Sequence, residues 1–130
     1  MAAVPAAKIL IVDDDKTFTT MAGALLRAAG YSPVVAFDAM QGFMFAQREG
    51  PVLILLDLSM PAGGGMQLLE KLQHSSRTQS VPVIIVTGTG GPSVEKDAKA
   101  KGVAAVVKKP VESKALLELV KQVLAERPAT

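Results

Sequence analysis

The feature that most constrains the fold is an alternation between short apolar runs and longer stretches with helical spacing. The three strongly apolar runs occupy residues 8–12, 52–56 and 81–86. The two weaker runs occupy residues 33–37 and 103–107. Short runs of branched aliphatic residues without polar alternation are typical of strands buried on both faces. The runs therefore predict five strands of a parallel sheet.

The stretches between the runs predict helices. Apolar residues spaced three or four apart form stripes in residues 18–29, 66–72 and 116–124, and shorter candidates occupy 39–48 and 93–101. Strand and helix thus alternate five times. Such alternation predicts an α/β fold in which a doubly wound parallel sheet carries helices on both faces.

Particular residues indicate where the predicted helices begin and end. Asp38 is a plausible N-cap for the helix at 39–48, and Pro92 suits the first turn of a later helix. A glycine stands where each of three helices should end, at Gly30, Gly50 and Gly102.

Length and composition favour a single domain over residues 1–130, with flexible ends expected at 1–7 and 127–130. Hydrophobic residues make up 49% of the chain, but no apolar run reaches the roughly 18 to 20 residues of a membrane span. The N-terminus has no basic region ahead of an apolar run, so we expect no signal peptide. The absence of cysteine excludes disulfides and thiolate metal sites and fits a cytoplasmic protein.

Charge and aromatic content argue against direct binding of nucleic acid. The formal net charge is +2, and the lysines near 96–109 are interpreted as a solvated helix surface. Tyr31 is the only aromatic residue with a polar tip, and tryptophan is absent. Base-stacking platforms are therefore poorly supplied, and no recognition helix is apparent. The single histidine, His74, lies in a polar stretch and excludes a multi-histidine metal site within the chain.

An acidic cluster directly follows the first predicted strand. In the sequence ILIVDDDKTF, residues 9–18, four aliphatic residues run straight into three aspartates. Adjacent carboxylates repel one another, and burial disfavours their charged forms. A cluster at the tip of a buried strand is tolerable if a cation shares it. In an open parallel sheet ligands bind beyond the carboxyl ends of the strands, so this edge is the expected site.

Polar residues follow four of the five predicted strands, and we expect them to meet at that edge. They are Asp13 and Asp14, Asp57, Thr87 and Lys109. Oxygen ligands alone favour Mg²⁺, which usually takes one or two carboxylates, keeps several waters and binds a phosphate oxygen. Asp14 and Asp57 would bind the metal directly, with Asp13 acting through a bound water.

The same residues suit phosphoryl transfer. A carboxylate can attack phosphorus as a nucleophile and form an aspartyl phosphate. The Thr87 hydroxyl could donate a hydrogen bond to the phosphoryl group. Lys109, held by the following Pro110, would be its counter-charge, because metal and lysine offset the charge of the equatorial oxygens.

Four short motifs, in this order and spacing, resemble the receiver domains of bacterial two-component response regulators. They are IVDDD (11–15), LLDLSMP (55–61), IIVTG (84–88) and VVKKP (106–110). The resemblance covers essentially the whole chain. It implies a flavodoxin-like, chemotaxis-receiver-like fold with strand order 2-1-3-4-5.

The resemblance also implies roles for individual residues. Asp57 matches the phosphoacceptor, and Asp13 and Asp14 match the acid pair that binds metal. Further matches are the Ser59 backbone carbonyl as a metal ligand, Thr87 as the switch hydroxyl, and Lys109 as the lysine that pairs with phosphate. Asp15 lies one residue past the acid pair and is interpreted as a helix cap.

The implied function is that of a signalling switch, not of a classical enzyme, although it promotes its own phosphorylation and dephosphorylation. A histidine kinase or phosphotransfer protein would pass a phosphoryl group from phosphohistidine to Asp57 with Mg²⁺ bound. This transfer would switch a face built by the fourth helix, fifth strand and fifth helix, which contains Lys99, Val106 and Lys114. A downstream effector or a second copy of the chain would bind that face.

Three features depart from the family pattern. Val106 stands where the family commonly has an aromatic residue, so we expect no rotation of an aromatic ring at this position. The movement of Thr87 would instead be transmitted through the glycine-rich loop that follows it, TGTGGPS (87–93). Gly64 in MPAGGG (60–65) replaces an acidic residue, which should alter that turn. The TGTGG segment also resembles a flavodoxin phosphate loop, but it follows the fourth predicted strand instead of the first.

Two other functions remain as alternatives. A receiver-like module that binds partners without phosphorylation usually lacks one of the key residues, yet all are present here. A phosphatase resembling the haloacid dehalogenases needs a second aspartate two residues after the nucleophile, and Ser59 occupies that position. The phosphorylation hypothesis requires Asp57 to face Asp13 and Asp14 and to be open to solvent.

Overall fold

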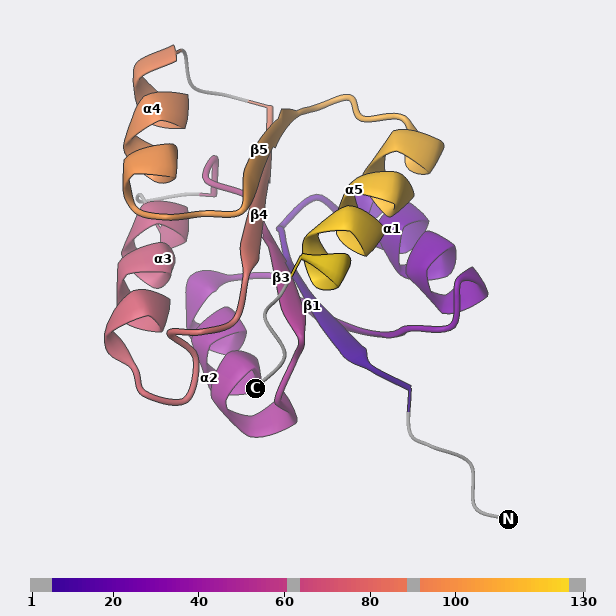
Figure 1. The fold of residues 1–130 in the computed structure, drawn as a ribbon, viewed down its shortest axis with the longest axis horizontal. Helices are drawn as coiled ribbons and strands as arrows, with labels where there is room; N and C mark the ends of the chain where they lie inside the picture. Colours follow the sequence, from indigo (N-terminus) through magenta and orange to yellow (C-terminus); the bar gives the residue numbers. More distant parts are fainter. Residues whose placement is uncertain (1–5, 61–63, 89–91, 127–130) are drawn as a thin grey trace.

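The five apolar runs form one parallel sheet. The computed structural model describes residues 6–60, 64–88 and 92–126. Its strand order is β2-β1-β3-β4-β5, which confirms the fold and the order expected from the resemblance (Figure 1). The strands are β1 Lys8–Val12, β2 Ser32–Ala36, β3 Leu53–Leu56, β4 Val83–Thr87 and β5 Ala105–Lys108. Each predicted boundary lies within two residues of the observed one.

A helix follows each strand, as the alternation predicted. The helices are α1 Lys16–Ala28, α2 Ala39–Glu49, α3 Gly64–His74, α4 Pro92–Ala100 and α5 Ser113–Ala125. The Asp38 side chain caps α2 by accepting a hydrogen bond from the Gln41 amide at 2.8 Å. Gly30, Gly50 and Gly102 follow α1, α2 and α4 with positive φ, as helix-ending glycines should.

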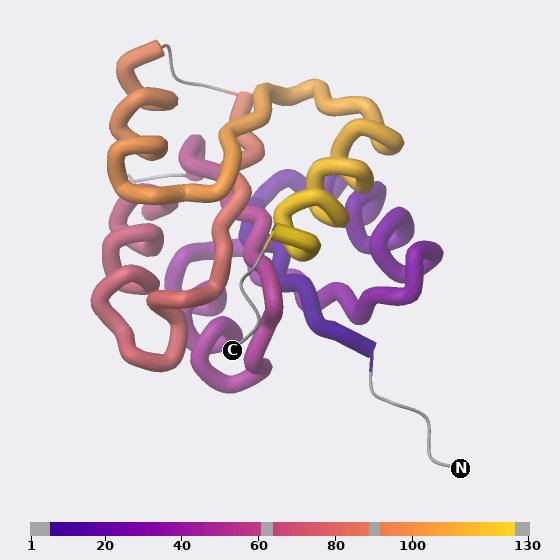
Figure 2. The backbone as a smooth tube through the Cα atoms, viewed as in Figure 1, coloured from indigo at the N-terminus to yellow at the C-terminus, as the bar shows by residue number. Residues whose placement is uncertain are grey.

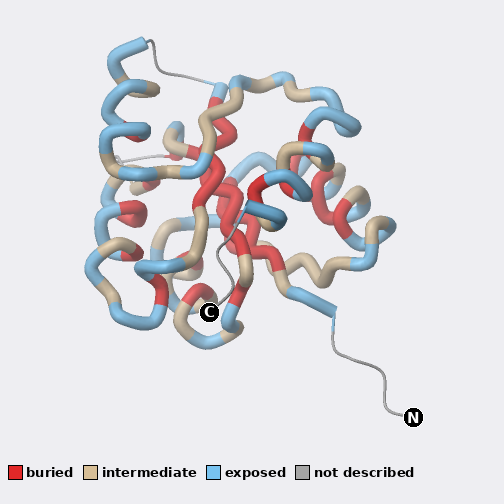
Figure 3. The backbone as a smooth tube through the Cα atoms, in the orientation of Figure 1, coloured by how far each residue is buried: buried red, intermediate tan, exposed pale blue. Residues whose placement is uncertain are grey.

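The sheet separates two apolar clusters. In Figure 1, α2, α3 and α4 lie on one side of the sheet, and α1 and α5 lie on the other. Successive residues of β1 point to opposite faces: Leu10 and Val12 pack under α2 and α3, whereas Ile9 and Ile11 pack under α1 and α5. Figure 3 shows the buried residues concentrated along the central strands and the inner sides of the helices. Burial on both faces explains the unbroken apolar runs.

The parallel register brings the carboxyl ends of the strands to one edge. Val12 of β1 pairs with Leu56 of β3, and Thr87 of β4 pairs with Lys108 of β5. Figure 2 shows the chain leaving β1 and β5 toward the same end of the molecule before it enters α1 and α5. Over the described residues, no helix combines the length and apolar character that crossing a membrane requires.

Gly65 allows the start of α3 to pack against the segment that follows β3. A Cβ atom on Gly65 would lie 2.4 Å from the Asp57 carbonyl oxygen and 2.7 Å from the Leu58 Cα. Both neighbours are backbone atoms, which cannot yield as a flexible side chain would. The glycine therefore fixes how closely α3 approaches Asp57.

We expect Gly65→Ala to destabilise the fold by roughly 1–3 kcal/mol, because the added methyl overpacks rigid backbone. Gly23→Ala is the matched control: Gly23 lies inside α1, and a Cβ there would meet nothing within 4 Å. That change should stabilise the protein by about 0.5–1 kcal/mol through helix propensity. Urea denaturation followed by circular dichroism measures both. Equal stabilities for the two variants would contradict the packing argument.

Candidate functional site

The structure brings the three predicted metal-binding carboxylates together. Asp13 and Asp14 follow β1, and Asp57 follows β3. Ligand oxygens of these three residues all lie within 4.8 Å of one another. Asp13 and Asp57 are buried, whereas Asp14 is exposed. A cluster of carboxylate oxygens open on one side has the donor chemistry that suits Mg²⁺, which keeps part of its water shell.

Lys109 places its ammonium beside this cluster. The Nζ atom lies 2.6 Å from Asp13 Oδ2, 3.7 Å from Asp57 Oδ2 and 3.8 Å from Asp15 Oδ2. It also lies 4.7 Å from the centre of the Phe18 ring. One cation thus contacts three carboxylates and also lies over an aromatic ring.

Backbone hydrogen bonds fix the rim on which these side chains stand. The Asp13 amide donates a hydrogen bond to the Ala36 carbonyl at 3.0 Å, and the Asp57 amide donates one to the Val12 carbonyl at 3.0 Å. The Lys109 amide donates to the Thr87 carbonyl at 2.9 Å. Each functional residue therefore continues the sheet ladder by one step beyond its strand.

Two hydroxyl residues hold the Asp57 carboxylate. Ser59 donates to Asp57 Oδ1 twice, from its amide at 2.9 Å and from its hydroxyl at 2.6 Å. The buried Thr87, the last residue of β4, also hydrogen-bonds Asp57 through its side chain. The two Ser59 contacts hold Oδ1, while Oδ2 lies 3.7 Å from Lys109 Nζ.

Burial and charge act in opposite directions on these groups. Burial by itself raises the pKa of Asp57, but the Ser59 hydrogen bonds, the Lys109 charge and Thr87 outweigh it and hold that pKa below its ordinary value. For Asp13, burial dominates over the Lys109 contact and raises the pKa. Burial lowers the pKa of Lys109, but the neighbouring carboxylates outweigh this and raise it. These contacts thus favour the ionised form of Asp57.

Asp15 is the N-cap of α1, which confirms its interpretation as a helix cap. Its Oδ1 accepts hydrogen bonds from the amides of Thr17 and Phe18 at 3.0 and 3.2 Å. Its own amide donates to Asp13 Oδ1 at 2.9 Å. The cap therefore also supports the neighbouring metal-site candidate.

Solvent access to Asp57 is narrower than the phosphorylation hypothesis anticipated. The residue faces its partners as required, but its side chain is only 2% exposed. A groove of about 370 Å³ lies beside it, between α1 and the segment after β5. Lys109 lines this groove, together with Phe18, Met21 and Val111. Among the described residues near Asp57, Asp14 is exposed and Lys109 lines the groove.

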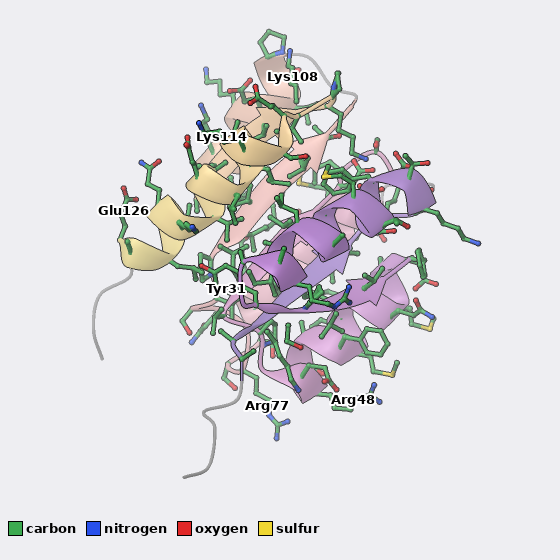
Figure 4. The ribbon with its side chains drawn as sticks, turned by 90° about the vertical axis from the view of Figure 1, so that its right-hand side faces the viewer. Tyr31, Arg48, Arg77, Lys108, Lys114 and Glu126 are labelled. Carbon is green, nitrogen blue, oxygen red and sulfur yellow. The ribbon has the colours of Figure 1, made fainter. Side chains whose placement is uncertain are left out.

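The expected interaction face lies along α4, β5 and α5. Val106 is half-buried, pairs with Ile85 and packs against the cluster beneath α2, α3 and α4. Lys99 and Lys114 are exposed. Figure 4 shows Lys108 and Lys114 in the upper part of the view and Arg77 at its lower end. The central residues of both glycine-rich loops, 61–63 and 89–91, lie outside the described residues, so the expectations for those turns stay predictions.

Sequence reasoning missed three contributors to the site. The Phe18 ring was assigned only to the apolar stripe of α1, Ser59 only to a backbone carbonyl, and Gly65 to no role. A hydroxyl two residues after a strand-end aspartate is a recognisable turn signal and could have identified the Ser59 contact. The Phe18–Lys109 contact joins residues far apart in sequence and has no local signal.

Comparisons with known proteins agree with this geometry. The family model of the response regulator receiver domain matches residues 9–121. PilH of Pseudomonas aeruginosa is 34% identical over 119 residues, which cover 92% of this chain and 98% of PilH. The phosphate regulon transcriptional regulatory protein PhoB of Escherichia coli is 30% identical over 119 residues, but the chain spans only 52% of PhoB.

Solved structures of similar proteins agree with the family match. A CheY-like receiver domain protein from Methanospirillum hungatei superposes with a TM-score of 0.87 at 31% identity, covering 94% of this chain and 96% of that one. The chemotaxis protein CheY4 of Vibrio cholerae superposes with a TM-score of 0.84 at 27% identity, covering 91% and 98%. The chain therefore belongs to the family of response regulator receiver domains, which act in two-component signalling.

Proposed function

We propose that this receiver is a phosphorylation-controlled switch whose phosphoacceptor is Asp57. The observation that carries the proposal is the set of contacts around Lys109, whose ammonium lies 2.6 Å from Asp13 and 3.7 Å from Asp57. An ionised, oriented carboxylate beside a fixed cation is what attack on phosphorus requires. The phosphoryl donor would be a phosphohistidine of a histidine kinase or phosphotransfer protein.

Asp13, Asp14 and Asp57, with the backbone carbonyl of Ser59, would hold Mg²⁺. When bound, the ion supplies positive charge that offsets the charge of the transferring phosphoryl group. The clustering of three carboxylates whose oxygens lie within 4.8 Å of one another supports this assignment, because three carboxylates carry more negative charge than the single ammonium of Lys109 offsets.

The chain's own residues perform the remaining tasks. An Asp57 oxygen forms the new bond to phosphorus as the bond from phosphorus to the donor nitrogen breaks, and the electron pair leaves with the imidazole. Lys109 exchanges a carboxylate partner for a phosphoryl oxygen. The Thr87 hydroxyl, already directed at Asp57, donates to another phosphoryl oxygen.

The added phosphoryl charge would shift a pre-existing equilibrium of the face formed by α4, β5 and α5. Thr87 and Lys108 are register partners, so a shift of Thr87 acts directly on β5. A downstream effector or a second copy of the chain would bind this face through residues such as Lys99 and Lys114.

Incubation with acetyl phosphate and Mg²⁺ should add one phosphoryl group, detected by intact mass spectrometry. The adduct should disappear in Asp57→Ala and in the isosteric Asp57→Asn, and persist in the distant control Asp38→Asn. A protein that forms no adduct would act as an interaction module without phosphorylation. An adduct that persists in Asp57→Asn would place the acceptor elsewhere.

Mg²⁺ affinity, measured by isothermal titration calorimetry, should fall by at least about tenfold in Asp14→Asn. A loss of this size follows even when a residue that merely supports a metal ligand is removed. Asp38→Asn removes the same charge from another helix cap and should leave the affinity within about twofold, since its carboxylate lies outside the cluster. Equal losses in the two variants would indicate a general charge effect and contradict the assignment.

Switching should proceed without a large rotation at position 106. Valine carries its methyl groups on Cβ and strongly prefers one rotamer, so it cannot alternate between distant poses as a ring can. Crystal structures with and without a phosphoryl mimic such as beryllium trifluoride should show Val106 in place and Thr87 displaced. A large swing of the Val106 side chain would refute this expectation.

A further inference from the structure

Asp15 is a carboxylate with two tasks. Its Oδ1 caps α1, whereas its Oδ2 lies 3.8 Å from Lys109 Nζ, almost as near as Asp57 Oδ2 at 3.7 Å. Its side chain is 49% exposed, while that of Asp57 is 2% exposed. The third carboxylate that contacts Lys109 therefore faces the solvent, from which a phosphoryl donor arrives.

The charge of Asp15 is not shared by the candidate metal cluster. Among the described residues, that cluster comprises Asp13, Asp14 and Asp57. Asp15 instead lines the groove of about 370 Å³ beside the site, and of the described residues lining the groove Lys109 alone is basic. An anion entering along this groove therefore meets a half-exposed carboxylate next to the cation it seeks.

We propose that Asp15 is a specificity-determining residue that selects phosphoryl donors by charge. It disfavours donors that approach as full dianions, such as acyl phosphates. It favours donors whose leaving group brings a positive charge next to the phosphoryl group, as in N-phosphorylated compounds. This inference rests on the proposed function, because it concerns the reaction at Asp57.

The two classes differ in charge but give the same product. With acetyl phosphate, a dianion, the Asp57 oxygen–phosphorus bond forms while the phosphorus–oxygen bond to acetate breaks, and acetate leaves with the electron pair. With phosphoramidate, a zwitterion of net charge −1 near neutral pH, the phosphorus–nitrogen bond breaks and ammonia leaves. Both reactions form the same aspartyl phosphate, so a difference in rate reflects how each donor approaches and transfers its phosphoryl group.

The test compares initial phosphorylation rates with phosphoramidate and acetyl phosphate, at matched Mg²⁺, by intact mass spectrometry. Asparagine caps helices as well as aspartate does, so Asp15→Asn removes the charge and keeps the cap. The ratio of the phosphoramidate rate to the acetyl phosphate rate should fall by about two- to threefold in this variant, which is what Coulomb's law gives for one unit of charge acting through water over molecular distances. The effect should shrink at high salt.

Asp38→Asn is the matched control, because Asp38 caps α2 and makes no ion pair with Lys109 within the described part of the chain. Its rate ratio should equal that of the unmodified protein. Thermal unfolding checks that the variants fold. If Asp15→Asn does not fold, Asp15→Ser provides a second uncharged helix cap for the same test.

The outcomes separate the two proposals. Adducts that form with an unchanged ratio in the Asp15 variants would overturn this inference and leave the proposed function intact. If Asp38→Asn changes the rate ratio as much as Asp15→Asn does, the inference would also be overturned, because the effect would then come from the net charge of the protein. No adduct with either donor would overturn the proposed function and this inference together.

Discussion

The attraction between one ammonium and several buried carboxylates governs the functional edge of this protein. Asp13 and Asp57 are 1% and 3% exposed, and carboxylates this buried are costly without a partner. Lys109 supplies that partner at 2.6 and 3.7 Å, and its ammonium also lies 4.7 Å from the centre of the Phe18 ring. Under the proposed function, an arriving phosphoryl group would have to break the same ion pair. The stability of the site and, under the proposed function, the sensitivity of the switch thus depend on one side chain.

The fold determines where this attraction acts. Parallel strands end at a common rim, and the register of β1, β3 and β5 makes the residue after each strand project from it. Ser59 and Thr87 then orient the Asp57 carboxylate, while Gly65 lets α3 begin against its backbone. The geometry is therefore assembled from segments that are far apart in the sequence but adjacent in the sheet.

The strands and the helix ends follow from patterns that can be read locally, whereas the strand order was implied only by the family resemblance. Strands buried on both faces must be uniformly apolar, and a positive φ favours glycine at a helix end, so both leave clear signals. The start of β5 was harder to predict, because Val103 and Ala104 continue the apolar run through the turn that precedes the strand. The contacts of Phe18 and Asp15 with Lys109 were missed because they join α1 to the segment after β5, and no spacing rule encodes side-chain contacts between such distant residues.

The helices differ in how firmly the core holds them. Of its nine residues, α4 buries only Ala98, whereas α1 buries five residues, among them Phe18 and Leu26. Burial of apolar surface contributes about 25 cal/mol per Å², so tilting α4 forfeits far less free energy than tilting any helix anchored by large side chains. Substitutions in the thin contact layer under α4 can therefore change the position of that helix, while the larger apolar layer under α1 keeps the rim that carries Asp13 and Asp57 in place.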